Sequence, residues 1–502
     1  MTQPTHAART LFDIDHGSRP HALEVAIILA AVLIVPIAMY VSHLAPYARW
    51  LYTLTNVLVA GWLYARRSPW YEGHCLLVFF CVSLVRRLVD EQAGWDPSNP
   101  VLLTPYLCCL YTVCSFFSYW ARPSPRYFGL FLGMLLSIGY GVLLAMLHER
   151  ILGSLVDALK WSIGPLFAVH VLARREQLAA MRAIVGSCLI WGGTAMSLYG
   201  VVQFVNPPTW DAAWMLNVAE LGLDSIGTPD PFRVRVFSTM NSPGSFGIML
   251  TAGIVLGLSR RMPVAAPTVA LMIIGLALCQ YRSIWAATVL AVLMGLSSGG
   301  KSLRPTNVLT VLVIFLALAS TAVMPRIREV VVSRASSLTA LKHDKSLESR
   351  LHQYAMLTHA DGLVLGEGLA INGASRRLDR ELPVHLDGAL IEIWRAMGVI
   401  VGTLFLFTLL APIVVLFRVP PGWSRHVLLD RALVVATFIQ LPIGTVHTGE
   451  LGFCAWMFLG FGLATCLTAS SQPQSRSTRD TRQPMRDWTP ASAALTLRAR
   501  RC

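Results

Sequence analysis

Four ionisable side chains lie where polar loops or turns of an otherwise apolar chain meet apolar runs. Arg235, in RVRVFSTMNSPGSFG, precedes one such run, and Arg282, in LCQYRSIW, lies at the short turn between two others. His385 and Asp387 stand where a long loop enters a further apolar run. Charged groups at the edge of a membrane are unfavourable unless they are paired or functional. We therefore expect the chemistry of this protein to be located here.

The two arginines suit an anionic phosphate ligand. A guanidinium group matches phosphate oxygens with two parallel hydrogen bonds and keeps its charge at any working pH. Two such groups near a membrane surface could hold a pyrophosphate whose lipid tail stays in the bilayer. Asn241 opens a predicted helix shortly after Arg235, and free N–H groups at a helix start can assist anion binding.

Structural roles for the same residues are the alternative. Arg282 could anchor a hairpin at the membrane surface, with its stem in the apolar layer and its charge in water. Arg235 could stabilise its loop, and His385 could be a hydrogen-bonded interfacial histidine. Asp387 and Glu392 could cap a helix or pair with cations.

The composition predicts an all-α, polytopic helical membrane protein that positions these residues. The chain has 502 residues, of which 55% are hydrophobic and 14% charged. Repeated apolar runs of about 20 residues predict about 12–14 transmembrane helices. The expected spans are 22–45, 50–65, 72–89, 100–120, 127–147, 151–172, 183–205, 244–258, 264–280, 283–297, 306–324, 387–417 with a break near Gly398, 427–444 and 450–468.

Two long polar stretches divide these spans into groups. The expected organisation is N-terminal transmembrane helices (1–205), a first periplasmic loop (206–243), central helices (244–324), a large periplasmic loop (325–386), C-terminal helices (387–470) and a disordered basic cytoplasmic tail (471–502). Inside the sixth span, Asp157 and Lys160 are three residues apart and can neutralise each other on one helix face.

Positive charge predicts the orientation. The net charge is +14, and it is concentrated in the tail and in alternate short loops, a pattern of membrane orientation and not of nucleic-acid binding. The opposite set of short loops offers only Arg49, Arg150 and Arg282. Both termini are therefore expected in the cytoplasm, and the two long loops outside. The basic loops contain Arg66, Arg67, Arg122, Arg126, Arg174, Arg175, Arg182, Arg260, Arg261, Lys301, Arg304, Arg418 and Arg425.

The back half of the chain, about 230–405, resembles the bacterial O-antigen ligase and polymerase superfamily. The resemblance is carried by RVFSTMNSPGSFG, YRSIW, ESRLHQY, LVLGEGLAING and HLDGALIEIWRAMGVIVG, in this order around one large loop. It implies a GT-C-like membrane fold. The run from Asp387 to Gly398 is closer to the polymerase form, and Leu386 departs from the polar residue that usually follows the histidine in ligases.

The resemblance implies a glycosyltransferase of the bacterial inner membrane that uses an oligosaccharide on undecaprenyl pyrophosphate. Arg235 and Arg282 would bind the pyrophosphate, and His385 or Asp387 would be the catalytic base. Arg350 and Asn241 would orient the substrate. We expect neither a cofactor nor a metal, because two arginines can replace a divalent cation electrostatically. Membrane lipid is an expected partner, and the partners could include a chain-length regulator protein; nucleic acid is not expected.

Other functions remain open at the sequence level. A polysaccharide flippase or other transporter would favour charges spread along a central path, whereas here Arg86, Arg87, Asp157 and Lys160 are the few charges within spans. A protein O-oligosaccharyltransferase would use the same donor with a protein hydroxyl as acceptor. Between polymerisation of O-antigen or exopolysaccharide and ligation to lipid A core, we favour polymerisation.

Overall fold

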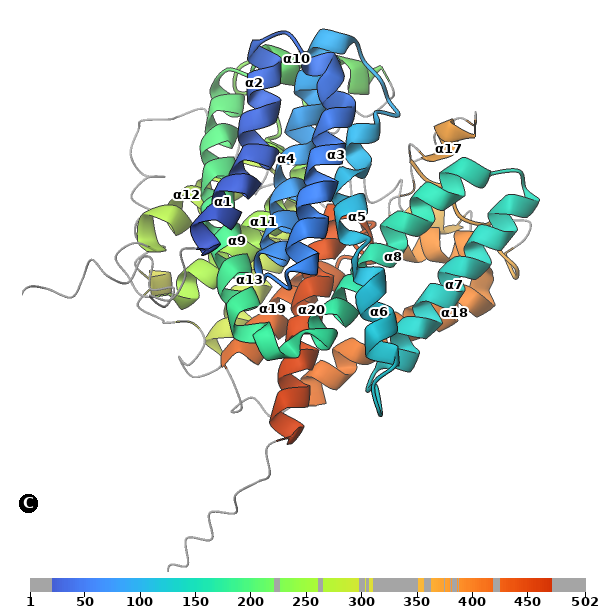
Figure 1. The fold of residues 1–502 in the computed structure, drawn as a ribbon. Helices are drawn as coiled ribbons and strands as arrows, with labels where there is room; N and C mark the ends of the chain where they lie inside the picture. Colours follow the sequence, from blue (N-terminus) through green and yellow to red (C-terminus); the bar gives the residue numbers. More distant parts are fainter. Residues whose placement is uncertain are drawn as a thin grey trace, which may run out of the picture.

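The protein is a bundle of helices in the computed structural model (Figure 1). The structure describes residues 20–220, 226–260, 265–297, 303, 307–309, 351–355, 363–373, 375–379, 381, 386, 388–418 and 425–471. Within these ranges every long element is a helix, as expected for repeated apolar runs that must satisfy their backbone groups internally.

Where the structure describes them, the helices follow the expected spans to within about five residues, except that the helix expected over 427–444 ends at Phe438. Most of the expected 306–324 span and of the expected 471–502 tail lies outside the described residues. The first half contains α1 (Pro20–Leu29), the π-helical turn η2 (Ala30–Ile34), α2 (Val35–Val41), α3 (Ala45–Ala65), α4 (Trp70–Ala93), η3 (Pro100–Leu103), α5 (Thr104–Cys109), α6 (Thr112–Trp120), α7 (Phe128–Leu147), α8 (Ile151–Ala173), η4 (Arg175–Gln177) and α9 (Leu178–Val205). The second half contains α10 (Thr209–Ala219), α11 (Pro243–Ser259), α12 (Ala265–Leu278), α13 (Arg282–Leu296), α17 (Ser375–Leu378), α18 (Ala389–Arg418), α19 (Arg425–Phe438) and α20 (Gly449–Ser471).

Several of these helices can cross a membrane. Seven stretches, each a single helix or two or three successive helical elements, are long and apolar enough, and three shorter helices are also apolar. Large apolar side chains point out of the bundle, such as Leu143 and Phe407, each 64% exposed. Such a surface is unfavourable in water and favourable in lipid. The protein is therefore a multi-pass helical membrane protein.

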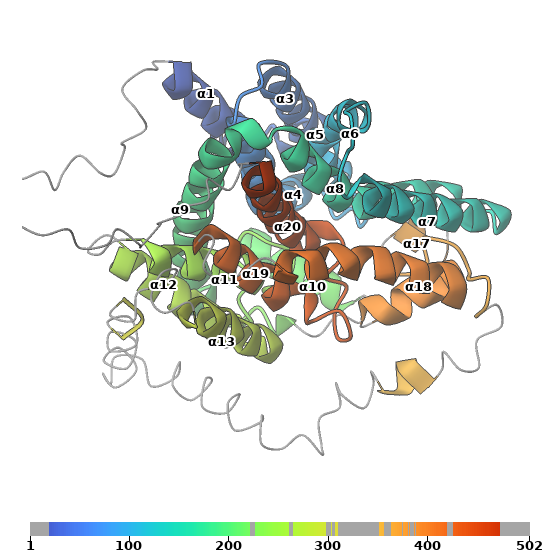
Figure 2. The same ribbon diagram turned by 90° about the horizontal axis from the view of Figure 1, so that it is seen from below.

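Helix α20 lies at the centre of the bundle, as the view from below shows (Figure 2). It contacts α8, α19, α18, α11 and α9 and is the most deeply buried of the seven candidate spans. Gly164 of α8 permits this packing, because a Cβ atom there would collide with the Trp456 ring of α20. Small residues that let helices approach closely are typical of membrane interfaces.

The break expected in the twelfth span occurs at Gly398. Its φ of 71° and ψ of 173° interrupt α18, and a Cβ atom at this position would collide with the Val364 carbonyl oxygen. Glycine adopts such angles without a steric penalty. The returning large loop therefore passes close to α18 at this point, where Val399 N donates to Leu363 O at 2.9 Å.

The first long loop contains a helix that the sequence analysis did not expect. Helix α10 lies across the end of α4, at the top in Figure 1. Its side chains Trp214, Met215 and Val218 pack with Phe237 in a small apolar cluster. The loop is therefore a folded cover over one end of the bundle.

Candidate active site

A cavity of about 470 Å³ lies beneath this cover. Its walls come from five parts of the chain: the end of α4 and the turn after it, α10, the stretch from 226 to α11, the turn before α13, and the link between α19 and α20. Arg377 and Leu386 from the large loop complete it. The stretch with Arg235 and Asn241, the turn before α13 and Leu386 of the large loop thus meet at this cavity.

Arg235 and Asn241 both line this cavity. Arg235 is half-buried, and its backbone N–H donates to Ile226 O at 2.9 Å. The next residue, Val236, donates to Leu278 O at 3.1 Å. The loop that carries Arg235 is therefore fixed to the α12–α13 hairpin. As expected, a helix opens just after Asn241, where Ser242 caps α11 by accepting from Ser245 N at 3.0 Å.

Arg282 is the first residue of α13 and is half-buried. Its neighbour Tyr281 lines the cavity. On its other side, Ser283 Oγ donates to Gln440 Oε1 at 3.1 Å, and Gln440 also lines the cavity. The hairpin is thereby tied to the link that precedes α20, so Arg282 lies next to the cavity wall that Arg235 shares.

His385, Asp387 and Arg350 lie outside the described residues. Leu386, between the first two, does line the cavity. Its backbone N–H donates to Asn372 Oδ1 at 3.0 Å. The structure therefore brings the chain between the two expected catalytic residues to the same cavity as Arg235.

Ion pairs and helix capping fix the described part of the large loop. Asp379 accepts hydrogen bonds from the backbone N–H groups of Leu152 at 3.1 Å and Gly153 at 2.9 Å, at the start of α8. A carboxylate is favourable at the N-terminus of a helix.

An ion pair fixes another part of the large loop, where Glu367 lies 2.7 Å from Arg395 of α18. These contacts hold the loop whose residues Arg377 and Leu386 line the cavity.

The charges expected inside the sixth span are paired. Lys160 Nζ lies 3.3 Å from Asp157 Oδ1, which confirms the predicted interaction. The second oxygen of Asp157 accepts from Ser375 Oγ at 2.9 Å. This pair therefore connects α8 to the large loop through α17.

Two cavity arginines were not identified as site residues from the sequence. Arg86 donates to Asp90 Oδ2 at 2.9 Å and to Asp96 O at 3.0 Å, and its guanidinium lies 4.4 Å from the centre of the Trp95 ring. Arg377 reaches the cavity from α17. A signal for Arg86 existed, because consecutive arginines inside an apolar run suggest function. Arg377 had no comparable signal, since several arginines surround it in the loop.

Arg87, next to Arg86, supports the cavity from behind. It is fully buried and donates to Ser238 O at 2.6 Å and Met240 O at 2.7 Å. These carbonyls belong to the stretch between Arg235 and Asn241. Helix α4 therefore contributes one arginine to the cavity and a second to the loop that forms its wall.

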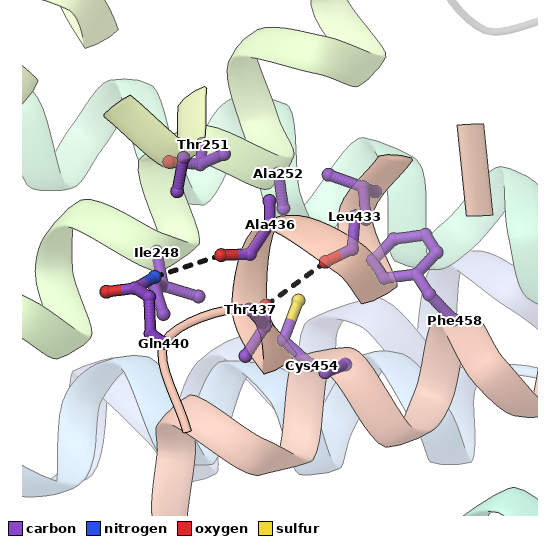
Figure 3. Close-up of a pocket in the computed structure, with 11 residues that line it drawn as sticks. Ile248, Thr251, Ala252, Leu433, Ala436, Thr437, Gln440, Cys454 and Phe458 are labelled. Atoms are coloured by element: carbon purple, nitrogen blue, oxygen red, sulfur yellow. Dashed lines mark hydrogen bonds between the residues drawn. The ribbon is translucent and has the colours of Figure 1, made fainter. Parts of the chain in front are cut away.

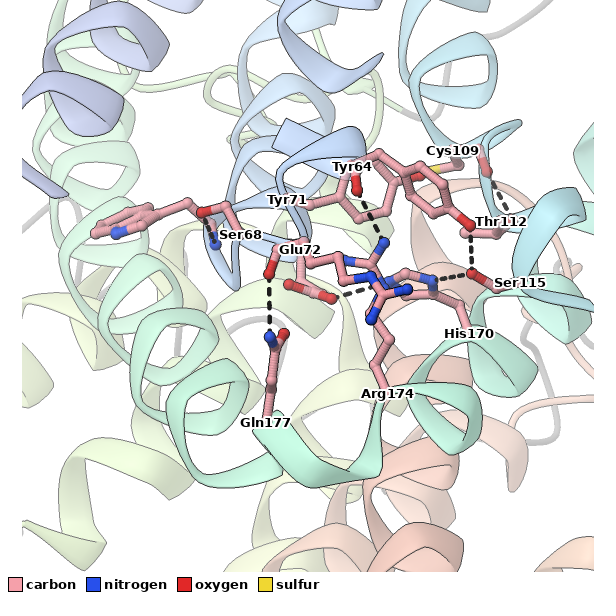
Figure 4. Close-up of polar contacts among 12 residues, drawn as sticks. Tyr64, Ser68, Tyr71, Glu72, Cys109, Thr112, Ser115, His170, Arg174 and Gln177 are labelled. Carbon is pink, nitrogen blue, oxygen red and sulfur yellow. Dashed lines mark hydrogen bonds and ion pairs between the residues drawn. The ribbon is translucent and has the colours of Figure 1, made fainter. Parts of the chain in front are cut away.

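A row of polar side chains elsewhere resembles a hydrolase triad in its order. His170 lies between Glu72, with Nε2 2.9 Å from Oε1, and Ser115, with Nδ1 2.7 Å from Oγ (Figure 4). Ser115 is 2% exposed, and the other two are 0% exposed. A nucleophile must reach its substrate. The row is therefore a buried hydrogen-bond network between α4, α6 and α8.

A second cavity, between α11, α13, α19 and α20, is too small for a substrate. Its volume is about 10 Å³, enough for one water molecule (Figure 3). Its polar residues already have hydrogen-bond partners: Gln440 Nε2 donates to Ala436 O, Thr437 Oγ1 donates to Leu433 O, and Thr251 Oγ1 bonds Thr288 Oγ1 of α13. Over the described ranges, no group of three His, Cys, Asp or Glu side chains could hold a metal ion.

No family model, curated protein or solved structure matches this chain.

Proposed function

We propose that the protein is a glycosyltransferase of the bacterial inner membrane that polymerises lipid-linked oligosaccharides in O-antigen or exopolysaccharide biosynthesis. The observation that carries the proposal is the 470 Å³ cavity, which Arg86, Arg235 and Arg377 line together at one end of a membrane bundle. The charge of Arg86 is balanced by Asp90, at 2.9 Å, so the argument for an anion depends on Arg235 and Arg377. Two guanidinium groups at one cavity favour a ligand with more than one negative charge. A pyrophosphate on an undecaprenyl carrier has this charge.

The rest of the cavity suits the sugar part of such a ligand. Trp95, Trp214 and Tyr281 present aromatic rings to it, and flat rings can pack against the apolar faces of sugars. Asn241 and Gln440 add amide groups that can bond hydroxyls. The cavity volume fits one or two sugar rings and a pyrophosphate better than a whole polymer. The rest of the growing chain would therefore lie outside the cavity.

In the proposed reaction, a hydroxyl of the acceptor sugar attacks the anomeric carbon of the donor. The bond from that carbon to the pyrophosphate oxygen breaks, and the electron pair stays on the leaving undecaprenyl pyrophosphate. Arg235 and Arg282 stabilise the charge that develops there. His385 or Asp387 accepts the hydroxyl proton as general base.

A ligase that transfers finished chains to lipid A core is the closest alternative. The Asp387–Gly398 motif and Leu386 favour the polymerase. A flippase is less well supported, because the arginines gather in one cavity at one end instead of following a path across the bundle. A protein O-oligosaccharyltransferase would use the same cavity and donor.

The test is the surface polysaccharide of a strain that lacks the protein, separated on a gel. For a polymerase, long chains disappear and single repeats still reach their acceptor. For a ligase, long chains stay on the lipid carrier and the core is bare, which would contradict the polymerase assignment. Unchanged polysaccharide would contradict both.

A further inference from the structure

The side chain of Asn372 holds the chain at Leu386, the residue between the two expected catalytic residues. Its Oδ1 accepts from the backbone N–H of Leu386 at 3.0 Å, and its Nδ2 lies 3.5 Å from the Leu386 carbonyl oxygen. These two groups belong to the peptide bonds that join Leu386 to His385 and to Asp387. A peptide group is planar, so a hydrogen bond to it also restricts the direction of the adjoining chain. Asn372 therefore acts on both links.

The segment that carries Asn372 is fixed on the bundle. Leu369 N donates to a carbonyl oxygen of α7 at 2.9 Å, and a Cβ atom at Gly153 of α8 would collide with the Ser375 carbonyl oxygen. Ala370 has a φ of 60°, an unfavourable angle for alanine that persists where the surroundings impose it. The Asn372 amide is therefore presented from a fixed support.

A buried carboxylate sets the orientation of this amide. Glu392 of α18 is 6% exposed and is hydrogen-bonded to the Asn372 side chain. Its second oxygen, Oε2, has no hydrogen-bond partner in the described part of the chain. A carboxylate accepts hydrogen bonds, and an amide donates only through its NH2 group. With the NH2 group bound to Glu392, Oδ1 is left to accept from Leu386.

Asn372 does not itself form the cavity wall, whereas Leu386 does. Its backbone carbonyl lies 3.0 Å from Ser375 Oγ, which in turn lies 2.9 Å from Asp157 Oδ2 of α8. All these contacts of Asn372 are with groups of the protein. Any effect of Asn372 on a reaction in the cavity must therefore act through the residues that it holds.

We propose that Asn372 is a positioning residue, which fixes the chain at Leu386 so that His385 or Asp387 is presented to the cavity in the direction that the reaction needs. This inference rests on the proposed polymerase function. A displacement of about 1 Å in a reacting group can lower a rate about 10²-fold. Loss of the Asn372 contacts should therefore lower kcat, and KM for the lipid-linked repeat should stay unchanged because Asn372 does not line the cavity.

The test measures kcat and KM for chain growth by the purified full-length protein in liposomes, together with its thermal unfolding midpoint. Asn372→Asp keeps an acceptor for the Leu386 N–H, but it loses the NH2 group and places a second carboxylate beside Glu392. We expect kcat to fall roughly 10²-fold at unchanged KM. Adding Glu392→Gln returns one amide to the pair, with the two groups exchanged, and should restore most of kcat.

A neutral variant tests the positioning role without an added charge. Asn372→Gln keeps the amide but lengthens the side chain, so it should lower kcat and leave KM and the unfolding midpoint unchanged. Asn217→Asp is the matched control and should keep the wild-type kcat. Asn217 donates to Ala213 O within α10 and does not line the cavity.

Wild-type kcat in both Asn372 variants would overturn this inference and leave the polymerase assignment standing. A raised KM at wild-type kcat would also overturn it, because Asn372 would then bind substrate. Loss of activity that only follows a lower unfolding midpoint would assign Asn372 to stability and overturn it as well. A wild-type protein that forms no polymer would contradict the proposed function and, with it, this inference.

Discussion

Arg87 Nε lies 2.8 Å from Asp211 Oδ1, and neither side chain is exposed. The ion pair joins α4 to α10, the helix that covers the candidate active site. Asp211 Oδ2 also accepts from Gln203 Nε2 at 2.6 Å and from Tyr199 Oη at 2.8 Å. Burial raises the pKa of the Asp211 carboxyl, and the Arg87 guanidinium opposes this shift. The cover and the cavity wall are thus held by one buried charge cluster.

Asp211→Asn should therefore destabilise the protein. Removing one partner of a buried ion pair leaves the other charge uncompensated and costs about 3–5 kcal/mol. The measurement is the thermal unfolding midpoint in detergent. Asp230→Asn, at an exposed position, is the control and should leave the midpoint unchanged. Equal midpoints for both variants would show that the Arg87–Asp211 pair does not stabilise the fold.

Arg377→Ala should reduce polymer formation strongly, because Arg377 lines the cavity. Loss of one group that stabilises transition-state charge typically lowers the rate about 10²-fold. Arg376→Ala is the matched control: Arg376 pairs with Glu381 at 2.7 Å and does not line the cavity. Polymer length and amount in a complemented deletion strain report the effect. Similar activity in both variants would remove Arg377 from the site.

Sequence reasoning predicted most helices because lipid imposes a simple condition on each span. A run of about 20 apolar residues must form a helix to satisfy its backbone. Helix α10 was missed because its eleven residues are shorter than a span. Pro208 before it and Asp211 in its first turn are helix-start signals that could have revealed it.

The candidate site was only partly predictable. Arg235 and Asn241 were identified because they precede the start of a helix, and both line the cavity. Arg377 was not, because long-range contacts place that part of the loop beside the bundle, such as those of Asp379 with the start of α8 and of Ser375 with Asp157. Contacts between segments more than two hundred residues apart leave no local pattern in a single sequence.

His447 should make stability depend on pH. It is buried in the link between α19 and α20, its ring packs 4.3 Å from the Trp161 ring, and neither ring nitrogen has a hydrogen-bond partner in the described part of the chain. Burial lowers its pKa to about 3. Between pH 6.5, the usual histidine value, and pH 3, the unfolded chain binds a proton that the folded protein does not. Stability therefore falls as the pH falls through this window.

His447→Phe tests this expectation with unfolding midpoints at pH 7 and pH 5. Phenylalanine keeps the ring contact and cannot be protonated. The wild type should lose about 2 kcal/mol more than the variant on acidification. The same acid-induced loss in both proteins would assign the pH dependence to other groups.

Reporter fusions test the orientation. The asymmetry of positive charge between alternate loops predicts that a reporter active only in the periplasm works when fused near Leu338 and fails after Ser471. A cytoplasmic reporter should show the opposite pattern. Periplasmic activity of the fusion at Ser471 would contradict the expected cytoplasmic location of the C-terminus and, with it, the proposed topology.

Chain growth by the purified protein, in liposomes that contain repeat units on undecaprenyl pyrophosphate, measures the proposed polymerase activity directly. We expect a ladder of products that increases by whole repeats, with release of undecaprenyl pyrophosphate. Arg235→Ala should abolish the ladder while the protein stays folded. Transport of the lipid-linked repeat across the bilayer with no covalent change, or a full ladder from Arg235→Ala, would contradict a polymerase that uses this cavity.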